Sequence, residues 1–113
     1  MKPELTSGVV ARAAVHAALA DPARLQIIDT LGAGDTSPSE LAAMLAIPSN
    51  LLAHHLRVLE QAGLVVTRRA GREKLHYLNP VPIRLIHDRW IDKYTEHRVS
   101  ALAGLKKTLE ETA

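Results

Sequence analysis

Basic side chains gather in one stretch of this sequence. Between Ser49 and His76 the chain carries five Arg and Lys residues and two Glu, a net charge of +3, although the whole chain carries only +2. Guanidinium and ammonium groups that lie close together neutralise phosphates, and this depends on the local patch rather than on the total charge. We interpret the stretch as a polyanion-binding surface rather than a solvated turn. Its basic residues are Arg57, Arg68, Arg69, Arg72 and Lys74.

The elements around this cluster can be predicted from periodicity and from residues that start or stop helices. Apolar spacing predicts helices over 8–19 and 22–31, the second with Asp21 as N-cap and Pro22 at its first position. A short helix from Pro38 is expected to bury Leu41, Met44 and Leu45, and a further helix runs over 49–61 and stops at Gly63. In the second helix, Leu25, Ile27, Ile28 and Leu31 are the expected apolar positions.

After Gly63 the apolar period changes from about 3.6 to 2, which predicts strands over 64–69 and 74–78 around a turn at 70–73. One long helix is expected over 83–112, with its apolar side interrupted near Arg98. The predicted fold is therefore mainly α with a small β-hairpin, a winged helix-turn-helix in a single domain of 113 residues. The helix-turn-helix covers about 38–62, the wing about 64–78, and the last helix is assigned to dimerisation.

A helix of this kind fits the major groove of DNA, and a hairpin can reach the backbone or the neighbouring minor groove. The helix over 49–61 is the expected recognition helix. His55 is in register with Leu52, Leu56 and Leu59, so we interpret it as a packing residue, whereas Leu51 either meets a thymine methyl or packs inside. The groove-facing residues are expected to be Ser49, Asn50, Ala53, His54 and Arg57.

Three segments, Leu19–Leu25, Ser39–Ala42 and Ala53–Val65, make the sequence resemble the ArsR/SmtB family of winged-helix repressors. The resemblance covers residues 12–79 well and the last helix more loosely. It implies a homodimer that represses transcription by binding a double-stranded operator, often with release by a metal or metalloid. The dimer is expected to use the apolar side chains that a small winged-helix body leaves uncovered, namely Val9, Ala13, Ala17, Leu102, Leu105 and Leu109.

The sensor sites of that family are poorly matched. Ser37 and Ser39 fall where the resemblance places a cysteine pair, and the chain has no cysteine, so we expect no response to arsenite, antimonite or cadmium. At the family's second site, Pro80 and Pro82 replace the first two ligands. We expect no resident metal or other cofactor. Imidazole and carboxylate groups on the last helix are the remaining candidates for Zn, Ni or Co, although interleaved Arg and Lys favour surface ion pairs: His87, Asp88, Asp92, Glu96 and His97.

Other classes of protein are disfavoured by the sequence. An enzyme needs a concave site with paired acid and base groups, and no such constellation or Gly-rich phosphate loop is present. The absence of an apolar run near ~20 residues excludes a membrane span, and the Met1–Glu4 start does not resemble a signal peptide, so a cytoplasmic protein is expected. A winged-helix protein-interaction module and a metal-sensing repressor are the alternatives to a DNA-binding repressor whose inducer is unknown.

Overall fold

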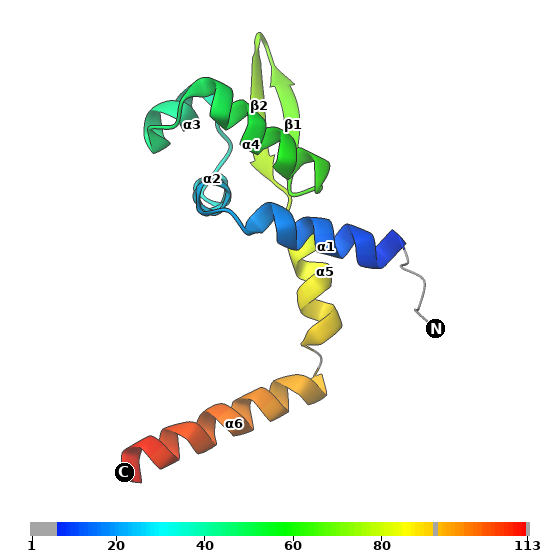
Figure 1. Ribbon diagram of the computed structural model, residues 1–113, viewed down its shortest axis with the longest axis vertical. Helices are drawn as coiled ribbons and strands as arrows, with labels where there is room; N and C mark the ends of the chain where they lie inside the picture. Colours follow the sequence, from blue (N-terminus) through cyan, green and yellow to red (C-terminus); the bar gives the residue numbers. More distant parts are fainter. Residues whose placement is uncertain (1–6, 92, 113) are drawn as a thin grey trace. The chain divides into compact units, whose positions relative to one another are not determined.

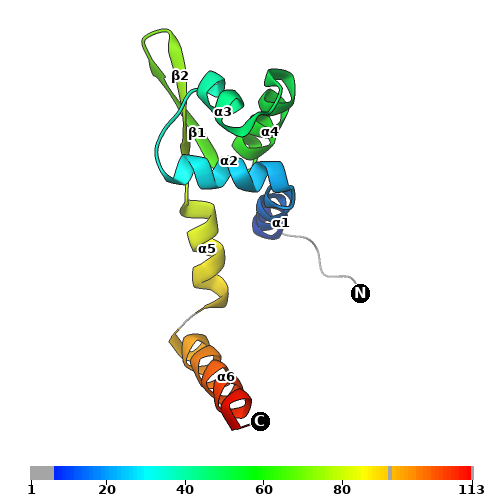
Figure 2. The same ribbon diagram turned by 90° about the vertical axis from the view of Figure 1, so that its left-hand side faces the viewer.

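A computed structural model of the chain describes residues 7–91 and 93–112. The chain divides into two compact units, Met1–Ile83 and Arg84–Ala113. The first unit contains four helices and a two-stranded antiparallel sheet, and Figures 1 and 2 show the turn of this hairpin projecting away from α1 and α2. The elements of the chain are α1 (Ser7–Leu19), α2 (Pro22–Gly32), α3 (Pro38–Leu45), α4 (Ser49–Gln61), β1 (Val65–Ala70), β2 (Glu73–Leu78), α5 (Val81–Trp90) and α6 (Lys93–Thr112).

The starts of α2 and α3 are fixed by polar side chains, as the sequence predicts. The Asp21 carboxylate accepts hydrogen bonds from the amides of Ala23 (2.8 Å) and Arg24 (3.3 Å). Ser37 accepts a hydrogen bond from the Glu40 amide at 3.3 Å, so this serine is the N-cap of α3. These contacts satisfy amides that have no partner within the helix. Ser37 and Asp21 therefore have structural roles that account for their residue types.

The hairpin is short and tightly closed. Ala70 pairs with Glu73, which leaves a two-residue turn in which Gly71 has a φ of 66°. A turn of this kind favours glycine because the left-handed backbone is costly for other residues. On its other edge β2 pairs with Thr36, whose amide donates to the His76 carbonyl at 3.2 Å and whose carbonyl accepts from the His76 amide at 2.9 Å. The segment before α3 is thereby fixed to the wing.

The core of the first unit is aliphatic, as a sequence without Phe requires. Two expected core residues are exposed instead: Leu25 at 45% and Met44 at 65%. In α2 the face that points into the core begins at the half-buried Arg24 and continues through Ile27, Ile28 and Leu31, so Leu25 lies outside it. In α3, Ala42 and Leu45 are half-buried, so the inward face lies on their side and Met44 falls outside it. The buried apolar residues are Val15, Ala18, Ile27, Ile28, Leu31, Leu41, Leu52, Leu56, Leu59, Leu64 and Val65.

The prediction of one helix over 83–112 is wrong, because the structure has α5 and α6 in its place. Ile91 belongs to neither helix, although its amide still donates to the His87 carbonyl at 2.7 Å. Bulky and β-branched residues such as Trp90 and Ile91 favour helix less than straight-chain residues do. Asp92, a residue type favoured at N-caps, stands directly before Lys93 in the sequence and lies outside the described residues. The spacing of apolar residues alone does not indicate that one helix ends and a second begins here.

Candidate nucleic-acid interface

The outer face of α4 carries the side chains that the sequence assigns to base reading. All five are exposed, as expected for residues that meet a partner. Leu51 is 44% exposed, so of its two expected roles the structure excludes packing inside. The five residues lie on one side of a single helix because they repeat at the spacing of its turns: Ser49, Asn50, Ala53, His54 and Arg57.

The inner face of α4 holds the helix in place. His55 is 6% exposed and lies beside the buried Leu52, Leu56 and Leu59, which confirms its interpretation as a packing residue. Its Nδ1 lies 3.3 Å from an Nη1 of Arg24. Because guanidinium has only donors, Nδ1 accepts this hydrogen bond and the proton of the neutral ring is on Nε2.

Arg24 ties this histidine to the first two helices. Its Nε donates to the Ala18 carbonyl at 2.6 Å, and its Nη2 donates to the Ala17 carbonyl at 3.4 Å. The same residue lies next to the Asp21 cap. Although burial alone would raise the pKa of Asp21, the hydrogen bonds from the Arg24 and Ala23 amides lower it below its ordinary value. One side chain therefore joins the end of α1, the start of α2 and the inner face of α4.

The basic side chains of the wing are all exposed, and the register of the hairpin divides them between its two faces. Paired residues of an antiparallel ladder lie on the same face. Arg69 pairs with Lys74, on the face that also holds the buried Val65 and His76, and α4 packs against β1. Arg68 pairs with Leu75 on the opposite face. Two cations thus lie directly across from each other on the face of the wing that is nearer the recognition helix.

A buried histidine connects this wing to α4. His76 is 4% exposed, and its Nε2 lies 3.7 Å from Oε1 of Glu60. Burial lowers the pKa of His76 and the charge of Lys74 adds to this effect, although the Glu60 carboxylate opposes it. Nδ1 is buried and makes no hydrogen bond to the described residues. The Lys74 main chain, like Glu60, acts against the effect of burial and raises the pKa.

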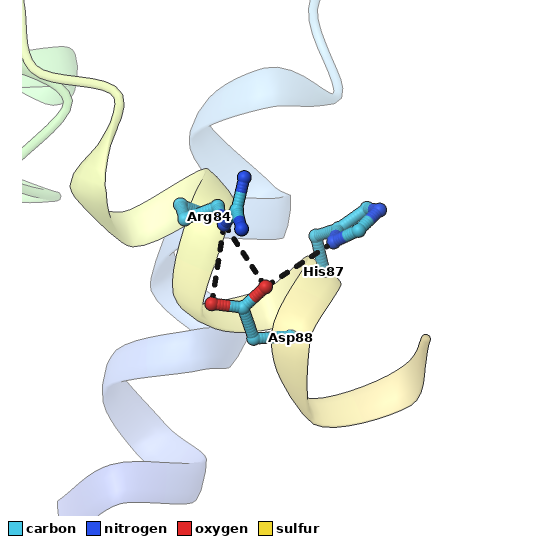
Figure 3. A network of polar contacts seen from close by, with 3 residues as sticks. All are labelled: Arg84, His87 and Asp88. Carbon is cyan, nitrogen blue, oxygen red and sulfur yellow. Dashed lines mark hydrogen bonds and ion pairs between the residues drawn. The ribbon is translucent and has the colours of Figure 1, made fainter. Parts of the chain in front are cut away.

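Two of the five candidate metal ligands, His87 and Asp88, lie in a surface ion-pair cluster with Arg84 (Figure 3). Asp88 is bound by Arg84, whose Nε lies 3.0 Å from Oδ1, and by His87, whose Nδ1 lies 3.4 Å from the same oxygen. Hydrogen bonds from His87 and Arg84 lower the pKa of Asp88. The side chains of Glu96 and His97 are outside the described part of the structure, as is Asp92. Among the described residues no group of three His, Cys, Asp or Glu could hold a metal ion.

A helix-turn-helix followed by a basic two-stranded wing, with a polar outer face on the second helix, defines the class of winged helix-turn-helix DNA-binding regulators. The model of a family described as "Helix-turn-helix domain" matches residues 19–68. The transcriptional regulator NmtR of Mycobacterium tuberculosis is 36% identical over 80 residues, 71% of this chain and 66% of that protein. The regulator Rv2034 of the same organism is 31% identical over 88 residues, 78% of this chain and 81% of that protein. The chain belongs to the ArsR/SmtB family of transcriptional regulators.

Solved structures agree with this assignment. An ArsR-like regulator from Rhodococcus sp. RHA1 superposes with a TM-score of 0.71 at 29% identity, covering 91% of this chain and 96% of that chain. A homodimeric winged helix-turn-helix domain from Mycobacterium bovis gives a TM-score of 0.63 at 27% identity and covers 75% of this chain and 82% of that one. The chain is therefore a regulator of the DNA-binding class and not an enzyme. None of the helices that the structure describes is long and apolar enough to cross a membrane.

Three residues that support the interface are missed by sequence reasoning. Arg24 enters it only through the family resemblance, and Glu60 and His76 only as members of a charged stretch. A signal for Arg24 does exist, because it begins the inward repeat that continues through Ile27, Ile28 and Leu31. For Glu60 and His76 no local signal exists, since their pairing depends on how the wing packs against α4.

Proposed function

We propose that this protein is a transcriptional repressor that binds duplex DNA as a homodimer, with α4 in the major groove and the wing along the backbone. The proposal is supported above all by one observation, the exposed polar face of α4 beside a wing with exposed cations. An α-helix fits the major groove, where each base pair presents a distinct pattern of donors and acceptors. A DNA-binding protein acts where the genome is, so we place it in the cytoplasm.

The side chains divide by chemistry into those that choose a sequence and those that add affinity. Asn50 can pair with the edge of adenine, and Arg57 and His54 can reach guanine or phosphate. Ser49 and Ala53 allow close approach of the helix. The four wing cations bind phosphate and carry no sequence information, and they are Arg68, Arg69, Arg72 and Lys74.

The dimer is proposed from exposed apolar side chains on terminal helices. Leu102, Leu105 and Leu109 are 66%, 56% and 59% exposed, and Val9 is 38% exposed. Ala13 and Ala17 are exposed on α1 as well. Each of the two helices thus carries its own exposed apolar residues, and exposed apolar patches mark protein–protein contacts. The related M. bovis domain is homodimeric. A two-fold dimer reads an inverted repeat with half-sites one helical turn or a multiple of it apart.

The test begins with selection of binding sites from random duplexes. We expect inverted repeats, and light scattering should give twice the mass of the chain at micromolar concentration. Fluorescence anisotropy then compares the selected site with random duplex for Asn50→Ala, His54→Ala and Arg57→Ala. Each substitution that removes a direct hydrogen bond to a base should reduce the difference in binding free energy between the selected site and random duplex by roughly 1–3 kcal/mol.

Gln61→Ala is the matched control, because Gln61 is exposed on α4 but lies at its C-terminal end. It should leave both affinities unchanged. If the three substitutions weaken selected and random DNA equally, the side chains contact phosphate only. If no sequence is enriched and no duplex binds, the proposal is wrong, and a protein-interaction module becomes the better interpretation.

A further inference from the structure

A groove opens in the first unit among α3, α4 and β2. It has a volume of about 390 Å³, which is within the range of small-molecule sites, roughly 300–1,000 Å³. Such sites combine an apolar lining with a few convergent polar groups. The lining residues are Pro38, Ser39, Ser49, Leu52, Ala53, Leu56, Arg57, Glu60, Lys74 and His76.

The charge and polarity of this lining favour an anion with an apolar body. Arg57 and Lys74 contribute two positive charges against the single carboxylate of Glu60, and Ser39 and Ser49 add hydroxyl groups. Carboxylates and phosphates are bound by such cations and hydroxyls. The apolar part of the lining includes Leu52, which is 1% exposed.

His76 forms a buried part of the groove wall. It is 4% exposed, and its Nε2 lies 3.7 Å from Oε1 of Glu60, which also lines the groove. The carboxylate of Glu60 therefore faces the imidazole, and the exposed cations Arg57 and Lys74 are the lining groups that attract an anion.

A DNA phosphodiester could provide such an oxygen, but it suits only part of the groove. A backbone phosphate can meet the exposed cations Arg57 and Lys74, yet the duplex that carries it is too wide to follow the lining down to Leu52 and Leu56. We propose that the groove binds a small organic anion, an apolar body with one carboxylate or phosphate. A second part of the proposal rests on the proposed function: this ligand competes with DNA, because both use Arg57 and Lys74.

The test titrates the full-length protein with phenyl phosphate, benzoate and inorganic phosphate, followed by calorimetry and by NMR of the amides and the His76 ring. We expect saturable binding of the first two, with shifts confined to α3, α4, β2 and the imidazole. Lys74→Ala removes a cation of the groove, and Ser39→Leu fills its edge from an exposed position. Each should weaken binding by about tenfold or more, Lys74→Ala because it removes a charge-assisted contact and Ser39→Leu because its side chain occupies part of the groove.

Arg72→Ala is the matched control, because it removes a cation of the same wing that does not line the groove; probe affinity should stay within a factor of two or so. Thermal unfolding checks that each variant folds. Absence of saturable binding at millimolar probe, or equal binding by Ser39→Leu, Lys74→Ala and wild type, overturns the proposal. Equal affinity for inorganic and phenyl phosphate also overturns it, in favour of an oxyanion site that DNA itself fills.

A separate experiment tests the competition. Phenyl phosphate should weaken binding of wild type to a random duplex and should have much less effect on Ser39→Leu, whose substituted residue is not among those proposed to bind DNA. If wild type binds no duplex at all, the proposed function fails while the direct titration still decides whether the groove holds an anion. If duplex binding is insensitive to saturating probe, the competition is refuted.

Discussion

Replacing Arg69 by Thr should stabilise the free protein and weaken its binding to DNA. Arg69 lies directly across the hairpin from Lys74, and both side chains are exposed. Like charges in this position destabilise an antiparallel pair by roughly 0.2–1 kcal/mol, and bound phosphate relieves the repulsion. Thr also favours the strand conformation. A residue kept for DNA binding at the expense of stability should therefore show opposite signs in the two measurements.

Arg68→Thr is the matched control, because it removes the same side chain from the neighbouring position but faces Leu75. Urea unfolding in low salt should give Arg69→Thr a free energy of unfolding about 0.2–1 kcal/mol above that of Arg68→Thr. The difference should disappear near ~1 M salt, where the Debye length is about 3 Å. For random duplex, the slope of log affinity against log salt should flatten by about 0.9 for each phosphate that the variant no longer neutralises.

The interpretation is refuted if the two variants are equally stable in low salt, or if their difference persists in high salt. The first result would mean that the two cations bend away from each other. The second would assign the effect to uncharged contacts that differ between the two positions rather than to charge. If Arg69→Thr gains stability yet binds DNA with an unchanged salt slope, the cation pair has another use than phosphate binding.

Three other predictions concern the framework that positions the interface. Burial lowers the pKa of His76 below its ordinary 6.5, so the unfolded chain binds more protons than the folded one. The contribution of His76 to the free energy of unfolding is therefore complete above about pH 6.5 and is lost as the pH falls. Urea unfolding of His76→Phe should show a free energy of unfolding that changes less with pH than that of wild type. Ala46 ends α3 with a φ of 52°, so Ala46→Gly should raise the free energy of unfolding by up to about 1 kcal/mol, measured by urea unfolding, and a decrease would contradict the strain. Arg24→Ala should cost about 1–3 kcal/mol in the same assay because it removes the hydrogen bonds to Ala17, Ala18 and His55, and a neutral result would show that these bonds are not stabilising.

The first unit could be predicted from the sequence because its signals are local. Asp21 and Ser37 are cap residues directly before Pro22 and Pro38, and Gly63 has the positive φ, 77°, that the end of a helix favours. The inward position of His55 followed from its register with three leucines. Each of these features depends on residues within about one helical turn, so a single sequence contains enough information.

The misplaced side chains and the divided helix depend on interactions that no local pattern contains. Met44 has the right spacing from Leu41 to be buried, but α3 is only eight residues long and what it packs against decides which edge faces inward. The same holds for Leu25, whose expected place is taken by Arg24. Apolar residues recur at helical spacing both before and after the break that follows Trp90, so the sequence pattern alone favours a continuous helix.

The two buried histidines show what the framework requires for DNA recognition. His55 receives its hydrogen bond from Arg24 on the inner face of α4, and His76 faces Glu60 of the same helix from the wing. The recognition helix is thus held to the helical body by one imidazole and to the hairpin by the other. Both are polar contacts in a small aliphatic core, where direction matters more than buried area. Apolar packing alone would allow α4 to rotate or slide against its neighbours, and a base-reading side chain that is displaced by such a movement can no longer make its hydrogen bonds. We infer that these contacts fix which face of α4 meets the groove, while the exposed cations determine how strongly the protein is held there.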